Sequence, residues 1–286
     1  MVEHSLQTIM NPALWALAFS MLPWPERRKV EVWEELFLDP SPALSPRESI
    51  ALEQLERDLP RLREEAQSRG ARLWLPGDED LERFLAPLPY PVALWVRGTL
   101  PPPGPALALV GSRQASLEGL RRAHRWGREL TRQGVRVLSG LARGIDGAAH
   151  RGALEAGATW GILGSGLDHP YPGEHCGLMD RMVEAGGGVI TPFPPSAPPR
   201  KWHFPRRNLI LAAWVHGVVV LEARLRSGSL LTGRLALDLG KELWVCPGAP
   251  ENSLMEGPNC LLREGAARVC RSVEDLLEDL NLPLGT

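Results

Sequence analysis

The segment from residue 107 to residue 151 constrains the fold more strongly than any other part of this sequence. The apolar run 107–110 leads into the loop 111–113, and a helix-like repeat of apolar residues follows. A second apolar run, 135–138, leads into a second loop of small residues, 139–144, and a second helix. Strands that alternate with helices at this spacing form a parallel sheet with crossover connections. We therefore expect an α/β fold.

The two loops carry the features of an anion-binding site. Open parallel sheets bind ligands at the carboxyl ends of their strands, where both loops lie. Each loop combines small residues with one arginine, Arg113 or Arg143, and with the free N–H groups of a helix start. The segment 111–151 contains nine arginines and only three acidic residues. For the arginines on the helices a solvated helix face is the favoured interpretation, whereas for the two loop arginines a function is favoured.

The rest of the chain extends this pattern on both sides. Further strands are expected at 72–75, 92–97, 159–163, 188–190, 217–221 and 243–245. Residues 1–75 read mostly as helices, one beginning at a capping box from Ser45 to Glu48 and another covering 59–68. We predict a small all-helical domain over 1–75. Over 76–286 we predict an extended Rossmann-like domain with a doubly wound, mainly parallel sheet.

The segment 192–205 holds six prolines, so we expect a loop there, followed by a helix over 209–215. The loop ends between Lys201 and Arg207 in the densest mixture of basic and aromatic side chains in the chain. Positive side chains can follow the phosphates of a single strand of nucleic acid, and a ring can stack on an unpaired base. The alternative is a basic loop whose aromatic side chains lie in the core.

Composition indicates a globular protein with a sizeable core, 44% hydrophobic and 23% charged. The net charge is −2, but the first 90 residues hold ten Lys and Arg against sixteen Asp and Glu. The later, basic part fits an anionic partner bound at one place and not a uniformly basic DNA-coating protein. The four cysteines form no CxxC pair, so we expect reduced thiols, no metal and no cofactor. No targeting or membrane-spanning segment is evident, so we expect a cytoplasmic location.

Three enzyme motifs are absent or incomplete. The sequence has no GxxxxGKS or GxxxxGKT phosphate loop and no GxSxG nucleophile elbow. The run Gly-Ser-Gly at 164–166 begins like a dinucleotide-binding GxGxxG, but His169 stands at the third glycine position. Asp146 and His150, one helical turn apart, suit a catalytic pair, or a capping carboxylate and a packed histidine. Glu222 suits a base, a holder of loop N–H groups or a partner of an arginine.

A series of motifs resembles the DNA-processing protein A (DprA/Smf) family over about 92–267. In order, they are Val110 to Arg113, Ser139 to Asp146 with Ala149-His150, Leu163 to Asp168, Tyr171-Pro172, Phe204 to Asn208, Glu222-Ala223, Ser227 to Leu230 and Pro247-Gly248. The resemblance implies a Rossmann-like protein that binds and protects single-stranded DNA and forms a homodimer. It also implies loading of the RecA recombinase onto incoming DNA during natural transformation. Because the enzyme motifs are missing, we expect that the protein is not an enzyme.

The expected DNA contacts combine residues implied by the resemblance with the small-residue loops at strand ends. They are Gly111, Ser112, Arg113, Ser139, Gly140, Arg143, Gly164, Lys201, Phe204, Arg207, Asn208, Ser227, Gly228 and Ser229. This sequence departs from the family pattern in places. Leu209 stands where the family usually has an arginine, Thr191-Pro192 replaces Ser-Glu, and Thr232-Gly233 replaces Thr-Ala. We expect no C-terminal winged-helix domain.

The alternative is a nucleotide-binding protein or an enzyme. Related Rossmann-like nucleotide phosphoribohydrolases, the lysine-decarboxylase-like family, carry the motif PGGxGTxxE at a strand-to-helix turn. The corresponding turn here, 226–233, reads RSGSLLTG and lacks the glutamate. The sequence therefore favours binding over hydrolysis.

Overall fold

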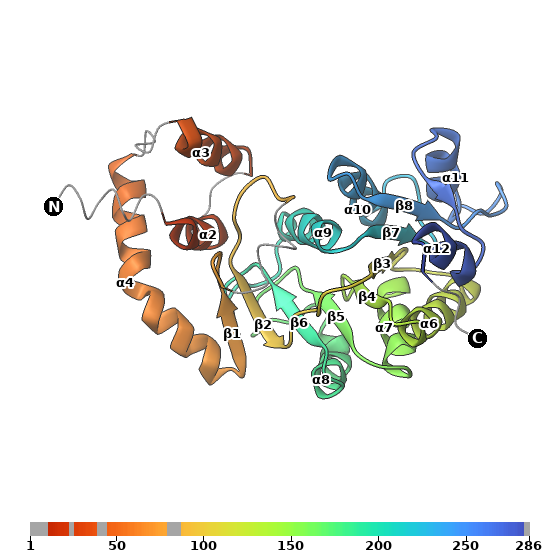
Figure 1. Ribbon diagram of the computed structural model, residues 1–286, viewed down its shortest axis with the longest axis horizontal. Helices are drawn as coiled ribbons and strands as arrows, with labels where there is room; N and C mark the ends of the chain where they lie inside the picture. The colour runs from red at the N-terminus through yellow and green to blue at the C-terminus, as the bar shows by residue number, and fades with distance from the viewer. Residues whose placement is uncertain (1–10, 23–25, 39–44, 79–86, 283–286) are drawn as a thin grey trace.

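The computed structural model describes residues 11–22, 26–38, 45–78 and 87–282, in which one nine-stranded sheet is flanked by helices (Figure 1). The strands are β1 (Ala71–Trp74), β2 (Leu94–Gly98), β3 (Ala106–Val110), β4 (Arg136–Ser139), β5 (Thr159–Ile162), β6 (Gly188–Thr191), β7 (Gly217–Val220), β8 (Glu242–Val245) and β9 (Arg268–Val269). The helices are α2 (Pro12–Met21), α3 (Glu26–Leu38), α4 (Pro46–Ser68), α6 (Leu117–Arg132), α7 (Ile145–Leu154), α8 (Cys176–Glu184), α9 (His203–Trp214), α10 (Gly228–Asp238), α11 (Glu256–Arg263) and α12 (Val273–Asp279), with a short 3-10 turn η1 (Gly173–His175).

The strand order is β1-β2-β6-β5-β4-β3-β7-β8-β9. In this order, every pair of neighbouring strands from β6 through β3 to β9 is parallel. Strand β2 pairs antiparallel with both β6 and β1. The chain winds outward from β3 to β6 on one side and from β7 to β9 on the other, so the order reverses between β3 and β7. This confirms the expected doubly wound, mainly parallel sheet. Its first strand, β1, precedes residue 76, where the Rossmann-like domain was expected to begin.

The two faces of the sheet are covered by different helices. All five residues of β3 are buried, and its side chains alternate between the faces. Ala108 and Val110 belong to the apolar cluster that includes α9 and α10. Leu107 and Leu109 belong to the cluster that includes α6 and α7. A central parallel strand covered on both faces needs such an uninterrupted apolar sequence.

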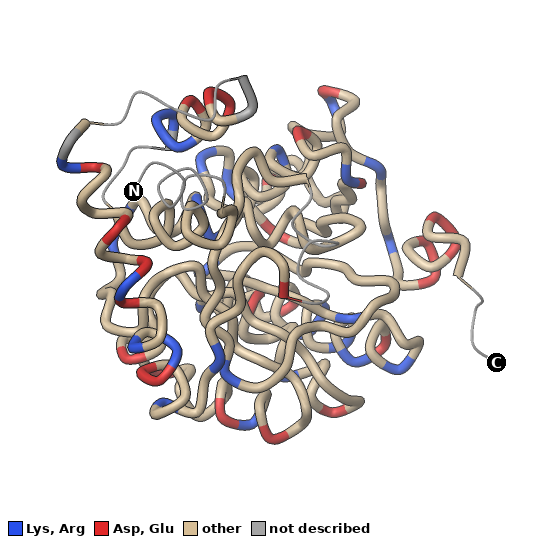
Figure 2. The backbone as a smooth tube through the Cα atoms, turned by 60° about the vertical axis from the view of Figure 1, so that its left-hand side comes forward, with Lys and Arg blue, Asp and Glu red and all other residues tan. Residues whose placement is uncertain are grey.

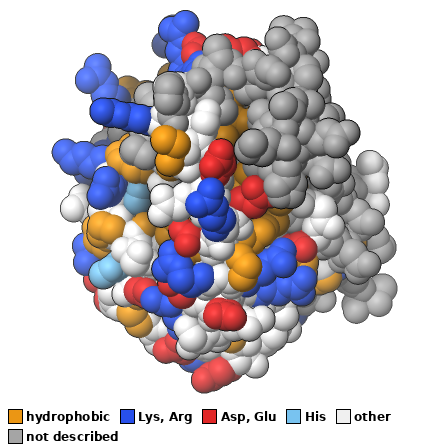
Figure 3. All heavy atoms as spheres, turned by 90° about the vertical axis from the view of Figure 1, so that its left-hand side faces the viewer, with side chains coloured by type: hydrophobic (Ala, Val, Ile, Leu, Met, Phe, Trp, Pro, Cys, Tyr) orange, Lys and Arg blue, Asp and Glu red, His pale blue; other side chains and the backbone are white. Residues whose placement is uncertain are grey.

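The N-terminal helices lie beside the β1 edge of the sheet (Figure 1). Helix α2 buries seven consecutive residues, 14–20. Helix α4 carries charges of both signs, including the pairs Arg57–Glu53 and Arg61–Glu65 (Figure 2). Viewed from this side, the described surface mixes basic, acidic and apolar side chains (Figure 3). This face is therefore not a uniformly basic surface.

Arg206 joins the N-terminal helices to α9. Its buried side chain donates a hydrogen bond of 2.6 Å to the carbonyl oxygen of Phe19 in α2. Its guanidinium carbon lies 5.9 Å from the ring centroid of Tyr90 and 5.6 Å from that of Phe193. Arg206 thus links α9 to the helical region, while the next residue, Arg207, reaches the carboxyl ends of the central strands.

The prediction of a separate helix over 59–68 is wrong, because α4 runs without a break from Pro46 to Ser68 and includes Pro60. The capping box at its start is confirmed: Ser45 accepts from the N–H of Glu48, whose carboxylate accepts from the N–H of Ser45. Buried leucines on both sides of Pro60 keep one packed face. That packing outweighs the hydrogen bond that a proline removes from a helix.

The boundary between loop and helix near residue 205 is also wrong in the prediction. Helix α9 begins at His203, so Phe204 to Asn208 lie in its first turns and not before a helix at 209. Pro205 is compatible with this position, because the first N–H groups of a helix have no intrahelical partner. The helix therefore fixes the spacing of Phe204, Arg207 and Asn208 along its first two turns.

Candidate nucleic-acid interface

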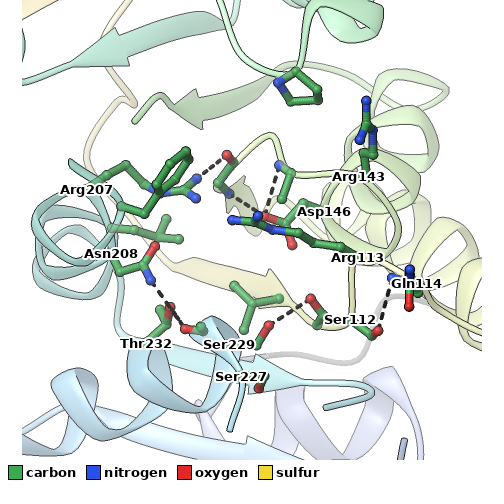
Figure 4. A pocket seen from close by; sticks show the side chains of 18 of the residues that line it. Ser112, Arg113, Gln114, Arg143, Asp146, Arg207, Asn208, Ser227, Ser229 and Thr232 are labelled. Atoms are coloured by element: carbon green, nitrogen blue, oxygen red, sulfur yellow. Dashed lines mark hydrogen bonds between the residues drawn. The ribbon is translucent and has the colours of Figure 1, made fainter. Parts of the chain in front are cut away.

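A cavity of about 640 Å³ opens where the strand order reverses, at the carboxyl ends of β3 and β7 (Figure 4). Its walls come from the loop after β3 (110–114), the loop after β4 (140–143), the first turns of α9, and the segment 224–229 that leads into α10. Open α/β sheets bind ligands at such a switch point. The cavity is large enough for a nucleotide-sized group.

The two loops predicted to bind an anion pack directly against each other. The N–H of Ile145 donates to the carbonyl oxygen of Ser112 at 3.2 Å. Gly144 has a φ of 75°, and a Cβ there would lie 2.2 Å from the same oxygen. A Cβ at Gly111 would lie 2.5 Å from Cγ1 of Ile145. The small residues are therefore required for the close contact between the loops.

Asp146 and Arg207 are buried on either side of the second loop. Asp146 Oδ2 accepts hydrogen bonds from the N–H groups of Gly140 at 3.1 Å and Ala142 at 3.3 Å. Arg207 Nη1 donates to the carbonyl oxygens of Gly140 and Ile162, the latter at 2.9 Å. Burial raises the pKa of Asp146 and lowers the pKa of Arg207 to about 10, and the attraction between the two groups opposes both shifts. The two side chains together hold the second loop in place.

Four exposed arginines surround the cavity. Arg113 and Arg143 come from the two predicted loops, and Arg224 and Arg226 come from the segment after β7. Arg143 forms an ion pair of 2.7 Å with Glu174, which raises the pKa of Arg143. Several cations around one hollow concentrate anionic ligands there.

Two aromatic rings form part of the cavity wall. Phe204 is partly buried against Gly164, where a Cβ would lie 2.8 Å from its ring. Tyr171 is 40% exposed, and its ring centroid lies 5.9 Å from that of Phe204 at an interplanar angle of 67°. The guanidinium carbon of Arg113 lies 5.3 Å from the Phe204 centroid. This wall can contact both the face of an unpaired base and its phosphate.

The start of α10 forms another wall. The side chain of Ser227 caps this helix. Ser229 Oγ donates to the carbonyl oxygen of Gly111 at 2.7 Å, and Asn208 Nδ2 donates to that of Gly228 at 3.3 Å (Figure 4). These bonds join the loop after β3, the start of α10 and α9. The helix N-terminus adds partial positive charge to the cavity.

Most of the predicted contact residues line this cavity: Gly111, Ser112, Arg113, Gly140, Arg143, Phe204, Arg207, Asn208, Ser227, Gly228 and Ser229. The structure does not bring the remaining three onto its wall. Ser139 is fully buried and donates to the carbonyl oxygen of Leu109 at 2.6 Å. Gly164 lies behind the Phe204 ring, and Lys201 is exposed just before α9.

The contacts of Glu222 and His150 favour the structural alternatives over catalysis. Glu222 is 3% exposed, and its carboxylate accepts hydrogen bonds from the N–H and the hydroxyl of Ser116, the cap of α6. His150 is fully buried, with Nδ1 2.8 Å from Oγ1 of Thr159. Burial lowers the pKa of His150 to about 3, so its imidazole is neutral at pH 7.

Sequence reasoning missed several residues of the cavity wall. Tyr171 was named only within the Tyr171-Pro172 motif and was not among the expected contact residues, although it lines the cavity. Arg224 and Arg226 follow β7 as Arg113 follows β3, and this correspondence was a usable signal. Gln114 belongs to the wall as well.

Fold and site together define a Rossmann-like α/β protein with a cationic, aromatic-walled cavity at its switch point. Residues 75–281 match the family model for DNA recombination-mediator protein A, and the chain belongs to this family. It is 42% identical to protein Smf of Escherichia coli (strain K12) over 218 residues, which are 73% of this chain and 57% of that protein. The match thus spans little more than half of that relative. The resemblance found in the sequence motifs is confirmed.

Solved structures give the same family. DNA processing protein A from Streptococcus pneumoniae is similar with a TM-score of 0.74 and 28% identity, covering 99% of this chain and 98% of that chain. DNA processing protein A from Helicobacter pylori, a protein described by its mode of binding single-stranded DNA, is similar with a TM-score of 0.66 and 25% identity. That similarity covers 74% of this chain and 95% of that chain.

In the described part of the chain, no cluster of three or more His, Cys, Asp and Glu residues is arranged to hold a metal ion. None of the described helices combines the length and the apolar character that crossing a membrane requires.

Proposed function

We propose that this chain binds single-stranded DNA in the cavity between the ends of β3 and β7. The observation that carries the proposal is the meeting of Arg113, Phe204 and Tyr171 on one wall, with the guanidinium carbon 5.3 Å from one ring centroid and the two ring centroids 5.9 Å apart. A cation beside two rings matches the alternation of phosphate and base along an unpaired strand. A duplex hides its base faces, so the rings favour single strands.

The wider role that we propose is protection of incoming DNA and loading of the RecA recombinase in natural transformation and recombination, in the cytoplasm. Membership of the recombination-mediator family supports this role. So does the similarity to a Helicobacter pylori relative described by its binding of single-stranded DNA. We also propose a homodimer, which the exposed Leu231 and Leu237 on α10 support. Two linked cavities would bind a long strand with higher avidity.

We propose, in addition, that the chain acts by binding and not by hydrolysis. The turn before α10 lacks the glutamate that the phosphoribohydrolase alternative requires, and Glu222 is bound to Ser116 at the cap of α6. Purified protein is expected to release neither base from nucleoside monophosphates nor phosphate from ATP. Robust turnover that disappears in Glu222→Gln would support the enzyme alternative instead.

A salt-titrated binding assay tests the proposed function. Affinities for one oligonucleotide and for the duplex of the same sequence are measured between low and physiological salt. Tighter binding of the single strand, with a linear fall of log affinity against log salt, is the expected result. Equal affinity for both forms would reduce the site to a general anion-binding surface. Binding of neither form would overturn the proposal.

A further inference from the structure

A second hollow lies outside the residues considered so far for DNA binding. It has a volume of about 360 Å³ and opens between the two helices that follow the anion-binding loops. Its lining comes from Leu120, Arg121 and His124 of α6 and from Ala148 and Arg151 of α7. We call it the α6/α7 groove. Its side chains are two cations, a histidine and a small apolar surface.

The backbones of α6 and α7 fix the width of this groove. A Cβ at Gly127 would lie 2.2 Å from the carbonyl oxygen of Ala149, and a Cβ at Gly152 would lie 1.8 Å from that of His124. Glycines at these positions therefore let the two helices touch. Such close packing leaves little room for the helices to slide, so the fold sets the distance between the backbones from which Arg121 and Arg151 extend.

Ion pairs distinguish Arg121 and Arg151 from the other cations around them. Arg122 pairs with Glu118 at 2.7 Å, while Glu155 lies 3.5 Å from Arg128 and 3.0 Å from His124. For the exposed Arg121 and Arg151, no carboxylate of the described residues lies within 4.0 Å. Their charge is therefore available to an external anion, unlike that of their neighbours.

The α6/α7 groove lies along the two helices that begin beside the cavity. Gln114 and Arg143 on the cavity wall come just before α6 and α7, so both helices lead from the cavity to the groove. A Cβ at Gly147 would lie 3.3 Å from Nη2 of Arg151, so this guanidinium points back toward the start of α7. Arg151 follows Ile145 by six positions along the helix, a rise of about 9 Å. A strand that leaves the cavity past Arg143 can reach this cation.

We propose that single-stranded DNA leaving the cavity crosses the α6/α7 groove, where Arg121 and Arg151 bind its phosphates; this rests on the function proposed above. The role differs from the one that sequence reasoning gave these arginines, a solvated helix face. The groove offers no aromatic side chain among its lining residues, so it contacts the backbone and adds affinity without reading bases. Its contribution appears only when the strand is longer than the cavity can hold.

The test uses oligothymidylates of increasing length, the double variant Arg121→Gln/Arg151→Gln, and a control with the same charge change, Arg63→Gln/Arg181→Gln. Arg63 and Arg181 are exposed on α4 and α8. For long strands we expect the groove variant to lose about tenfold in affinity at physiological salt, with a salt slope shallower by about 1.4, because each phosphate contact contributes about 0.7. The groove variant should bind the shortest strand as tightly as the wild type does. The control variant should bind strands of every length as tightly as the wild type does.

Three results would overturn the groove assignment. The first is unchanged affinity of the groove variant for long strands. The second is an equal loss for strands of every length or in the control, which would indicate a general effect of net charge. The third is an equal loss in Arg121→Lys/Arg151→Lys, because lysine keeps the charge that phosphates require. A wild type that binds no strand of any length would instead refute the proposed function, and the groove role with it.

Discussion

Asp146 and Arg207 hold the two polar ends of the same residue, Gly140. The buried carboxylate of Asp146 accepts the N–H of Gly140, and the buried guanidinium of Arg207 donates to its carbonyl oxygen. Helix α7 supplies the first group and α9 the second, so the loop after β4 is fixed from both sides of the sheet. Arg207 was expected to contact DNA, and its bonds in the structure suit positioning of the loop.

Replacement of Arg207 tests this positioning role. Arg207→Met leaves the Asp146 carboxylate buried without its cation, a situation that typically destabilises a protein by about 3–5 kcal/mol. The double variant Asp146→Asn/Arg207→Met removes the unpaired charge, so its free energy of unfolding should recover in part. Urea unfolding of the two variants measures the difference. If Arg207→Met keeps wild-type stability but binds DNA weakly, Arg207 contacts the strand directly.

Gly144→Ala and Gly186→Ala test the contact between the loops. Both glycines have positive φ, 75° and 81°, so alanine is strained at either position, and more so at Gly144, whose ψ of −125° lies outside the left-handed helical region. A Cβ at Gly144 would also lie 2.2 Å from the carbonyl oxygen of Ser112, whereas a Cβ at Gly186 meets nothing within 4 Å. Gly144→Ala should therefore cost about 1–3 kcal/mol more and weaken DNA binding. Equal unfolding free energies for the two variants would contradict the steric contact.

The sheet could be predicted from the sequence because its central strands, such as β3 and β7, are short apolar runs that alternate with helix-like segments. The cavity followed from the same pattern, since parallel strands bring their carboxyl ends together. The start of α9 could not be predicted, because Pro205 follows a run of prolines and reads as a loop residue, and the bond of Arg206 to Phe19 joins segments far apart in the sequence. Burial of Ser139 was equally invisible, since a small polar residue at a strand end fits a core or a ligand site.

A pH dependence of stability follows from His150. Burial lowers its pKa from 6.5 to about 3, so between these values the unfolded chain binds a proton that the folded chain does not. Its stabilising contribution is complete above pH 6.5 and is lost as pH falls toward 3, by at most about 1.4 kcal/mol per pH unit. His150→Gln keeps a donor for Thr159 but does not titrate. The fall in unfolding free energy between pH 7 and pH 5 should be smaller in this variant; an identical fall would exclude the histidine as its source.

Arg113 is expected to bind a phosphate at the end of β3. Arg113→Ala should weaken binding to all single-stranded sequences alike and make the salt slope shallower by about 0.7, the contribution of one phosphate contact. Arg132→Ala, an exposed arginine at the end of α6, supplies a control with the same change of charge. Affinities measured at several salt concentrations decide the matter. Unchanged slope and affinity in Arg113→Ala would remove this residue from the interface.

Phe204 and Tyr171 are both expected to stack on bases, but their burial differs. Phe204 packs against Gly164 and is partly buried, so Phe204→Ala should lower both the melting temperature and the affinity for single strands. Stacking of one base contributes about 1–3 kcal/mol, which corresponds to roughly tenfold or more in affinity. Phe204→Tyr should retain most of it. Lys201→Ala removes a charge and no packed ring, so it should reduce the salt slope and leave the melting temperature unchanged.

Tyr171 separates stacking from stability more cleanly, because its side chain is 40% exposed on the cavity wall. Tyr171→Ala should lose affinity for single strands by a similar factor, with the melting temperature and the salt slope nearly unchanged, since no charge is removed. Tyr171→Phe keeps the ring and should bind as the wild type does, while Tyr171→Leu keeps apolar area without a ring and should not. Oligonucleotide affinity and melting temperature are measured on the same preparations. If Tyr171→Leu restores full affinity, the wall contributes apolar contact and not base stacking.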